Sequence, residues 1–435
     1  MEQDTVTNPS VLSLAASDVS GQVLLPQRET RAGTSVVLNG LRRFSWGGRP
    51  TQVGTTALES IPTFTNEFWT RKQRAGHSLH EVSYRACFKP QLVDFFVQRL
   101  TVPGDVVYDP FMGRGTTIIE AALLGRRAVG CDVNPLSVVL TKPRLSPPML
   151  EEVEARLAVI DLHEEVNPPD DLTVFYHPET LQAICALRKY LGRRRQAGTA
   201  DSVDEWIEMV AVNRLTGHSR GFFSVYTLPP NQAVSVASQV KINARRAQIP
   251  PRRDVASLIL RKTRSLLRGC DATTRRRLAG TGARTPLLVR SAARTDGIRT
   301  GSVDLVVTSP PFLDVVDYAT DNWLRWWFCG IEAETVPITI ARTLETWRLA
   351  MKEVFLELQR VVAPGGYVAF EVGDVKGGTI RLEDAVVPCG MAAGLEAVAV
   401  VINDQFFTKT ANCWGVSNNR KGTNTNRIVL FRKPE

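Results

Sequence analysis

A strand-turn-helix unit near residue 110 constrains the fold of this chain more than any other feature. The apolar run Val106–Tyr108 ends at Asp109, and a turn with Gly113 and Gly115 follows before helix-like residues begin at Thr116. Glycine lets a backbone approach a ligand closely, and the N-terminus of a following helix presents free N–H groups. The sequence therefore predicts a parallel α/β sheet that holds a nucleotide-like cofactor at this turn.

An acidic residue in the next βα unit indicates which kind of cofactor this is. Asp132 closes the following apolar run about 20 residues later, the position where a carboxylate hydrogen-bonds ribose hydroxyls. A helix cap is the alternative role for Asp132. The turn lacks the Lys followed by Ser or Thr that a P-loop requires, so ATP is a poor candidate. We expect cofactor contacts from Asp109, Pro110, Phe111, Gly113, Gly115, Thr116, Thr117, Asp132 and Asn134.

Short, nearly continuous apolar runs predict the remaining strands. Such runs are typical of strands that are covered on both faces in a parallel sheet. The expected strands cover residues 106–111, 128–133, 287–292, 303–309, 367–372, 397–402 and 427–431. Together they predict a Rossmann-like α/β fold with a doubly wound, mainly parallel, seven-stranded sheet.

The interval between the second and third strands is far longer than an ordinary crossover and is mainly helical in pattern. We expect residues 146–285 to form an inserted, mostly helical subdomain between two parts of the sheet domain, 61–145 and 286–435, after a loosely ordered arm at 1–60. The insert is rich in arginine, including Arg193–Arg195 and Arg275–Arg277, and also carries Phe222 and Phe223. Arginine with aromatic residues can bind nucleic acid, but a solvated face over a small core is an equally good reading.

Composition narrows the class of protein. With 435 residues and 43% hydrophobic content, the chain can bury a large core. No apolar run of about 18 residues and no signal-peptide pattern occur, which favours a cytoplasmic protein without a membrane anchor. The seven cysteines show no metal-ligand spacing, so we expect no metal. The formal charge of +9 permits a polyanionic partner without requiring one.

The second informative segment is Thr308–Phe312, which reads Thr-Ser-Pro-Pro-Phe directly after the fourth predicted strand. Proline lacks an N–H donor and stiffens the backbone, so the Ser309 hydroxyl and the Pro310 carbonyl would be fixed hydrogen-bond acceptors. Phe312 adds an aromatic ring after the two prolines. Taken alone, this segment would be read as a strand end with a Pro-Pro turn.

Together, Asp109–Thr117 and Thr308–Phe312 resemble the motifs of the amino-methylating DNA methyltransferases. The resemblance implies a class I methyltransferase that uses S-adenosylmethionine to methylate N4 of cytosine or N6 of adenine in double-stranded DNA. It also implies a donor-side role for Lys89 and Pro90 and a catalytic role for Ser309, Pro310, Pro311 and Phe312.

Details of the motifs refine this expectation. Relatives with serine at the position of Ser309 are more often N4-cytosine enzymes, so this base is our first expectation. Many relatives carry an acid after the third strand, where this chain has Ser291. Either Ser291 takes the place of that acid beside the donor's adenine, or packing and backbone contacts hold the adenine. Adenine N6 methylation, an RNA methyltransferase and an inactive nucleic-acid-binding relative remain alternatives. A cognate restriction endonuclease is a further partner that the resemblance admits, and the insert would recognise the target.

Overall fold

The computed structural model of the protein describes residues 33–56, 61–69, 76–85, 87–228, 232–282, 284–311, 318–337, 341, 343–375, 380–404 and 425–435. All statements below concern these residues. The predicted catalytic residue Phe312 lies outside them.

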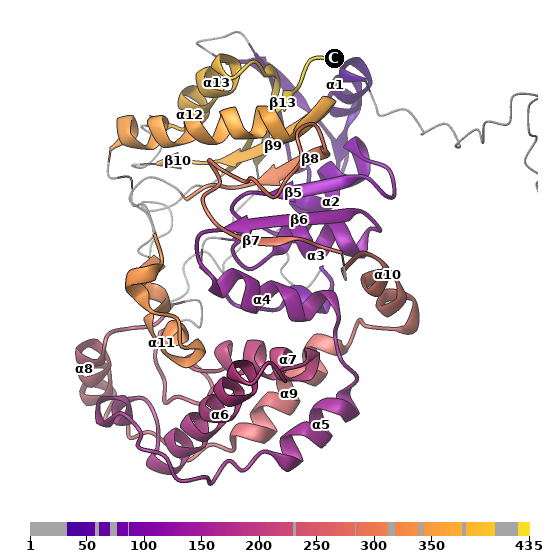
Figure 1. The fold of residues 1–435 in the computed structure, drawn as a ribbon. Coiled ribbons are helices and arrows are strands. Elements are labelled where there is room, and N and C mark those ends of the chain that lie inside the picture. The colour runs from indigo at the N-terminus through magenta and orange to yellow at the C-terminus, as the bar shows by residue number, and fades with distance from the viewer. Residues whose placement is uncertain are drawn as a thin grey trace, which may run out of the picture. The chain divides into compact units, whose positions relative to one another are not determined.

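The main sheet of the described residues has nine strands in the order β3-β4-β12-β13-β9-β8-β5-β6-β7 (Figure 1). In chain order the strands are β3 Gln52–Thr55, β4 Pro62–Asn66, β5 Val106–Asp109, β6 Arg127–Asp132, β7 Leu287–Val289, β8 Val303–Thr308, β9 Val362–Val372, β12 Glu396–Asp404 and β13 Thr425–Arg432. Two small antiparallel pairs accompany it, β1 Ser45–Trp46 with β2 Arg49–Pro50 and β10 Asp374–Val375 with β11 Ile380–Arg381.

All seven predicted strands are present, and their pairing is mainly parallel. Strand β5 lies between β6 and β8, β7 extends the sheet beyond β6, and β9 extends it beyond β8, all in parallel register. Strand β13 then runs antiparallel between β9 and β12. Counted along the predicted strands, the order is 3-2-1-4-5-7-6. The carboxyl ends of β5, β6 and β8 therefore meet at one edge, which is where open α/β sheets bind ligands.

The N-terminal region differs from the expected loosely ordered arm. Within the predicted arm, helix α1 Thr34–Arg43 buries Leu41, and β3 pairs with β4. Strand β4 adds to β12 in parallel register, which enlarges the expected seven-stranded sheet to nine strands. Both strands are short, and every residue of β3 is exposed, so no apolar pattern marked it in the sequence.

Helices cover both faces of the sheet. Helices α2 Pro90–Leu100, α3 Thr116–Leu123 and α4 Leu136–Leu145 share one apolar cluster with Val107. Helices α12 Leu344–Val361 and α13 Glu383–Ala392 share the opposite cluster with Tyr108. Neighbouring residues of one strand thus point into different cores, as the pleat requires.

In the described residues of the predicted insert, the regular elements are helices, and one isolated bridge joins Gly217 and Tyr226. The helices are α5 Leu150–Val159, the 3₁₀ helix η3 Asp170–Val174, α6 Pro178–Gln196, α7 Ser202–Val212, α8 Val236–Arg246, α9 Val255–Leu267 and α10 Ala272–Gly282. Helices α5, α6, α7 and α9 gather together, whereas α10 lies beside α3 (Figure 1). Arg277 Nη1 donates to the Leu123 carbonyl over 2.8 Å, so α10 covers the sheet rather than the insert. The remaining helices are η2 Ser78–His80, α11 Tyr318–Cys329 and η4 Ala333–Thr335.

Candidate active site

The turn after β5 depends on two glycines for different reasons. Gly113 has a φ of 49° and Gly115 a φ of 74°, a region that glycine adopts readily. A Cβ on Gly115 would also lie 2.3 Å from Oγ1 of Thr141, so the turn packs directly on α4. At Gly113 a Cβ would make ordinary contacts, with the Tyr84 ring at 3.5 Å and the Phe111 carbonyl oxygen at 3.9 Å. Gly113 therefore faces a space, and Gly115 anchors the start of α3.

Asp132 at the end of β6 supports this turn. Its Oδ2 accepts a 2.8 Å hydrogen bond from the Gly113 N–H, and its Oδ1 accepts one of 2.9 Å from the Asn134 N–H. Burial raises the pKa of Asp132, while these backbone donors counteract that rise. The carboxyl group is therefore held in a fixed orientation beside Gly113.

Asp109 at the end of β5 is instead enclosed by protein. It is 1% exposed, and its Oδ1 accepts hydrogen bonds from Thr308 Oγ1 at 2.6 Å and from the Phe111 N–H at 3.0 Å. Its Oδ2 has no hydrogen-bond partner among the described residues. Burial, the dominant cause, raises the pKa of Asp109 to about 7. This carboxyl joins the ends of β5 and β8 and does not face a ligand space.

The serine-proline segment after β8 lies beside the glycine turn. Its Pro311 carbonyl accepts a 2.8 Å hydrogen bond from the indole Nε1 of Trp347 in α12. Trp347 is 2% exposed, because its ring is packed in the apolar cluster of α12 and α13. Its hydrogen bond therefore fixes the backbone that follows Ser309.

A cavity of about 340 Å³ joins the two motifs. Its size lies within the range of small-molecule sites. The cavity is lined by Tyr84, Arg85, Cys87, Phe88, Pro110, Phe111, Met112, Gly113, Thr116, Asp132, Val133, Asn134, Ser291, Ala292, Ala293, Ser309, Pro311, Tyr318, Pro337, Ala341, Trp347, Ala350, Met351, Glu353 and Val354.

Most of the predicted site residues meet at this cavity. Nine of them line it: Pro110, Phe111, Gly113, Thr116, Asp132, Asn134, Ser291, Ser309 and Pro311. Six described residues of the prediction do not: Lys89, Pro90, Asp109, Gly115, Thr117 and Pro310. Pro90 is the first residue of α2, and Thr117 Oγ1 donates to the Val307 carbonyl over 3.0 Å. These residues shape the surrounding elements.

Sequence reasoning missed the wall contributed by α12. Trp347, Met351 and Val354 recur at helical spacing on the buried face of that helix, a pattern that looks the same for any core helix. Only their position beside the end of β8 makes them part of the site. The opposite wall contains Tyr84, whose ring stacks with that of Tyr318 at a centroid distance of 6.3 Å.

Two buried arginines hold the segment that carries Tyr84. Arg114 Nη1 donates to the Val82 carbonyl over 2.8 Å, and Arg144 Nη1 donates to the Leu79 carbonyl over 3.0 Å. Arg144 Nη2 also donates to the Arg114 carbonyl. Desolvation lowers the pKa of Arg144 to about 9, so the guanidinium stays charged at neutral pH. These bonds fix residues 79–82 against the glycine turn.

His77 and His80 flank this segment without lining the cavity. His77 caps η2 by accepting from the Leu79 N–H. His80 Nε2 lies 2.6 Å from Oε2 of Glu120. Burial lowers the pKa of His80 and raises that of Glu120 to about 8, so burial disfavours the charged form of both groups.

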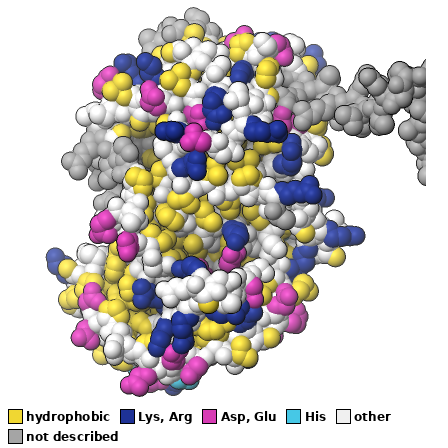
Figure 2. Space-filling model, in the orientation of Figure 1, with side chains coloured by type: hydrophobic (Ala, Val, Ile, Leu, Met, Phe, Trp, Pro, Cys, Tyr) yellow, Lys and Arg dark blue, Asp and Glu magenta, His cyan; other side chains and the backbone are white. Residues whose placement is uncertain are grey.

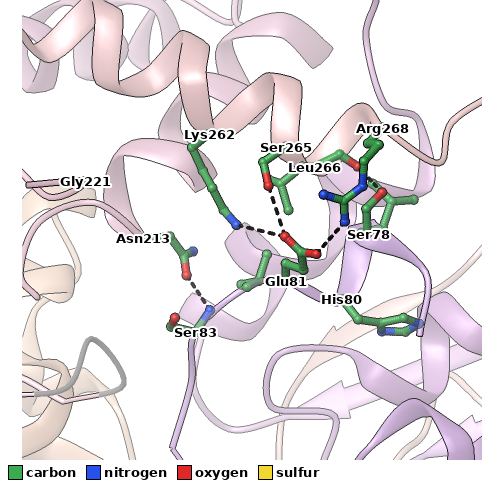
Figure 3. Close-up of polar contacts among 12 residues, drawn as sticks. Ser78, His80, Glu81, Ser83, Asn213, Gly221, Lys262, Ser265, Leu266 and Arg268 are labelled. Atoms are coloured by element: carbon green, nitrogen blue, oxygen red, sulfur yellow. Dashed lines mark hydrogen bonds and ion pairs between the residues drawn. The ribbon is translucent and has the colours of Figure 1, made fainter. Parts of the chain in front are cut away.

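The same segment is bonded to the insert (Figure 3). Glu81 Oε1 lies 2.8 Å from Arg268 Nη2, and its Oε2 accepts from Ser265 Oγ at 3.0 Å. The Ser83 N–H donates to Asn213 Oδ1 over 2.8 Å. One wall of the cavity is therefore held by α9 and by the residue that follows α7.

The described residues contain no group of three or more His, Cys, Asp or Glu side chains that could hold a metal. Among them, no helix is long and apolar enough to cross a membrane.

Comparisons with known proteins find similarity over part of the chain. A model of the DNA methylase family that covers N6 and N4 methyltransferases matches residues 50–142. Type II methyltransferase M.MjaII of Methanocaldococcus jannaschii is 34% identical over 76 residues, 18% of this chain and 14% of that protein. Type II methyltransferase M.MvaI of Kocuria varians is 32% identical over 111 residues, 25% of this chain and 23% of that protein. The chain thus spans less than a quarter of the length of either relative.

Solved structures show weaker likeness. Geranyl diphosphate C-methyltransferase from Streptomyces coelicolor A3(2) superposes with a TM-score of 0.32 and 9% identity, covering 79% of this chain and 75% of that one. TrmN from Thermus thermophilus gives a TM-score of 0.30 at 12% identity, covering 82% of this chain and 51% of that one. TM-scores this low do not establish a shared fold. The fold is therefore identified from the strand order described above.

That strand order, with the glycine turn after the first predicted strand and the acid after the second, defines a class I methyltransferase fold. Within it, residues 50–142 match the model of the DNA methylase family, and parts of the chain are similar to the Type II methyltransferases M.MjaII and M.MvaI.

The cofactor of this fold and family is S-adenosylmethionine, and the cavity fits it. Gly113 exposes its backbone to the space, Asp132 offers a carboxyl group, and Phe111 and Val354 provide apolar surface. A cavity that combines apolar walls with few polar groups suits a nucleoside with a short charged tail.

Proposed function

We propose that this protein transfers a methyl group from S-adenosylmethionine to the exocyclic N4 amine of a cytosine in double-stranded DNA. The observation that carries the proposal is the joint lining of one cavity by Gly113 and Asp132 from the donor motif and by Ser309 and Pro311 from the acceptor motif. The donor and the base would thus meet in a single space.

The acceptor segment supplies the chemistry that an aromatic amine needs. The lone pair of such an amine is delocalised into the ring, so the nitrogen is a poor nucleophile. Hydrogen bonds from the amino group to the Ser309 hydroxyl and the Pro310 carbonyl would favour a tetrahedral nitrogen with an available lone pair. The Trp347 bond to the Pro311 carbonyl would keep these acceptors in position. S-adenosylmethionine, when bound, supplies an electrophilic methyl group.

The donor side would orient the cofactor. We assign Asp132 to the ribose hydroxyls, Ser291 and the apolar side chains near it to the adenine, and Gly113 to the close backbone approach. Asn134 and Thr116 line the same space. Phe312 would stack on the flipped base, a role that stays a prediction.

A second candidate function is methylation of an exocyclic amine in structured RNA. It is favoured by one finding: a tRNA (guanine(10)-N2)-dimethyltransferase of Methanocaldococcus jannaschii is 39% identical over 63 residues, 14% of this chain and 18% of that protein. Its name describes amino methylation of a base, as we propose here, but on a different nucleic acid.

Radiolabelled methyl transfer would distinguish these functions. The protein is incubated with labelled S-adenosylmethionine and either unmethylated bacterial DNA or total RNA, with Ser309→Ala as the matched variant. Label in DNA from the wild type, lost in the variant while S-adenosylmethionine still binds, supports the proposal. Label in RNA alone would transfer it to the second candidate.

A further inference from the structure

The arginines of the insert differ in whether a carboxylate neutralises them. Figure 2 shows Asp and Glu side chains interspersed among Lys and Arg. In α6, Arg194 Nε lies 2.9 Å from Asp204 Oδ2, and Arg193 and Arg195 pair with Glu164 and Glu208. A paired arginine contributes little to attraction of an anion, so this basic run is a weak candidate for binding one.

A second set lacks such partners. Among the described residues, Arg214, Arg220, Arg253 and Arg261 form no ion pair with a carboxylate, and the charged neighbours of Arg214 and Arg253 are other arginines. Two of them converge on Gly221, where a Cβ would have Ser219 Oγ at 3.4 Å, Arg261 Nη2 at 3.8 Å and Arg214 Nη1 at 3.9 Å. We call Arg214, Ser219, Gly221 and Arg261 the arginine cradle.

Neutral groups hold the cradle in shape. Arg214 Nε donates to the Asn213 carbonyl over 2.7 Å, and its guanidinium lies 4.1 Å from the centre of the Phe222 ring. Arg261 Nη2 donates to the Arg220 carbonyl over 3.1 Å. These contacts fix orientation and leave the positive charge unbalanced. Burial and the nearby Arg261 lower the pKa of Arg214 to about 10, which still leaves it charged at neutral pH.

A hydrogen bond connects the cradle to one wall of the candidate active site. Asn213, which precedes Arg214, accepts from the N–H of Ser83 (Figure 3). Ser83 in turn precedes the cavity-lining Tyr84. Arg261 and Ser219 are exposed, so an extended ligand can reach the cradle.

We propose that the arginine cradle binds a backbone phosphate of the nucleic-acid strand whose base enters the cavity. Paired guanidinium groups match phosphate oxygens, a serine hydroxyl adds a donor, and a glycine leaves room for the group. The proposal rests on the proposed function, because it presumes a nucleic-acid substrate.

The test compares two exposed arginines of α9, of which Arg264 is paired with a carboxylate and, within the described part of the chain, Arg261 is not. Arg264 is exposed and lies 2.6 Å from Glu154, so Arg264→Gln and Arg261→Gln remove the same formal charge from one helix. Binding of the full chain to a fluorescein-labelled duplex of about 30 base pairs is measured by anisotropy between 50 and 200 mM salt. A single-stranded RNA probe is run in parallel.

We expect Arg261→Gln to weaken duplex binding about tenfold and to lower the slope of log K against log salt by about one, while Arg264→Gln stays within about twofold. Gly221→Ala should also weaken binding, because its methyl group fills the cradle without creating a short contact. Equal losses of duplex affinity in the two arginine variants would contradict the proposal that the arginine cradle binds a phosphate. Binding to RNA alone, still dependent on Arg261, would retain the cradle and reject the DNA function, and no binding to either probe would contradict both.

Discussion

Thr308 Oγ1 donates a 2.6 Å hydrogen bond to the carboxyl of Asp109, so the last residue of β8 is bonded to the last residue of β5. The two strands carry the acceptor and donor motifs, respectively. This buried hydrogen bond fixes the spacing between the two motifs. It gives Asp109, the first residue of the glycine motif, a structural role that needs no contact with a ligand.

The buried Asp109 predicts a pH dependence of stability. Its pKa is about 7 in the folded protein and has the ordinary value of 3.8 when unfolded, so its contribution is full below pH 4 and is lost as pH rises to 7. Each pKa unit is worth about 1.4 kcal/mol, giving a loss of up to about 4 kcal/mol. Urea unfolding at pH 5 and pH 8 should show a larger fall for the wild type than for Asp109→Asn. Equal falls would contradict the burial argument.

Asp132 should control binding of the cofactor. Asp132→Asn removes a fixed carboxylate from the cavity and should weaken S-adenosylmethionine binding about 10- to 100-fold, the worth of a charged hydrogen bond. Calorimetric titration measures this directly. Asp109→Asn is the matched control, because Asp109 does not line the cavity and its replacement should change affinity by less than about threefold. If both variants bind equally well, Asp132 is not a cofactor ligand.

A side chain at Gly115 should lower the free energy of unfolding. Gly115→Ala combines a positive φ with a Cβ only 2.3 Å from Thr141 Oγ1, whereas Gly125→Ala has a φ of 76° and no atom within 4 Å. The Gly125 variant should cost about 1 kcal/mol of unfolding free energy from strain alone. The Gly115 variant should cost about 1–3 kcal/mol more, because α3 and α4 must separate. Denaturant unfolding of both variants tests this, and identical costs would show that the close packing carries no penalty.

Trp347 should act as a positioning residue. Trp347→Phe removes the hydrogen bond to the Pro311 carbonyl and should lower the rate of methyl transfer about tenfold, while S-adenosylmethionine affinity changes by less than about threefold. Trp206→Phe is the control, since it also removes one buried indole hydrogen bond, to Thr263 Oγ1 within the insert. A loss of cofactor affinity as large as the loss of rate would mean that Trp347 only shapes the cavity.

The sequence was sufficient for the seven predicted strands and for nine residues of the cavity, because each motif directly follows an apolar run. It was insufficient for β3 and β4, because both strands are short and every residue of β3 is exposed, so that pairing rather than pattern decides their conformation. The enclosed position of Asp109 also escaped prediction, since a strand end does not reveal which atoms cover it. Pairing of arginines cannot be read from sequence either: the partner of Arg264 lies 110 residues away.

The account's central claim is transfer of a methyl group to a base amine in DNA. The most direct test incubates the protein with S-adenosylmethionine and unmethylated bacterial DNA, digests the product to nucleosides and identifies them by mass spectrometry. The account predicts N4-methylcytosine. N6-methyladenine would contradict the choice of base while keeping the amino chemistry, and DNA without any methylated amine, from protein that binds the cofactor, would contradict the central claim.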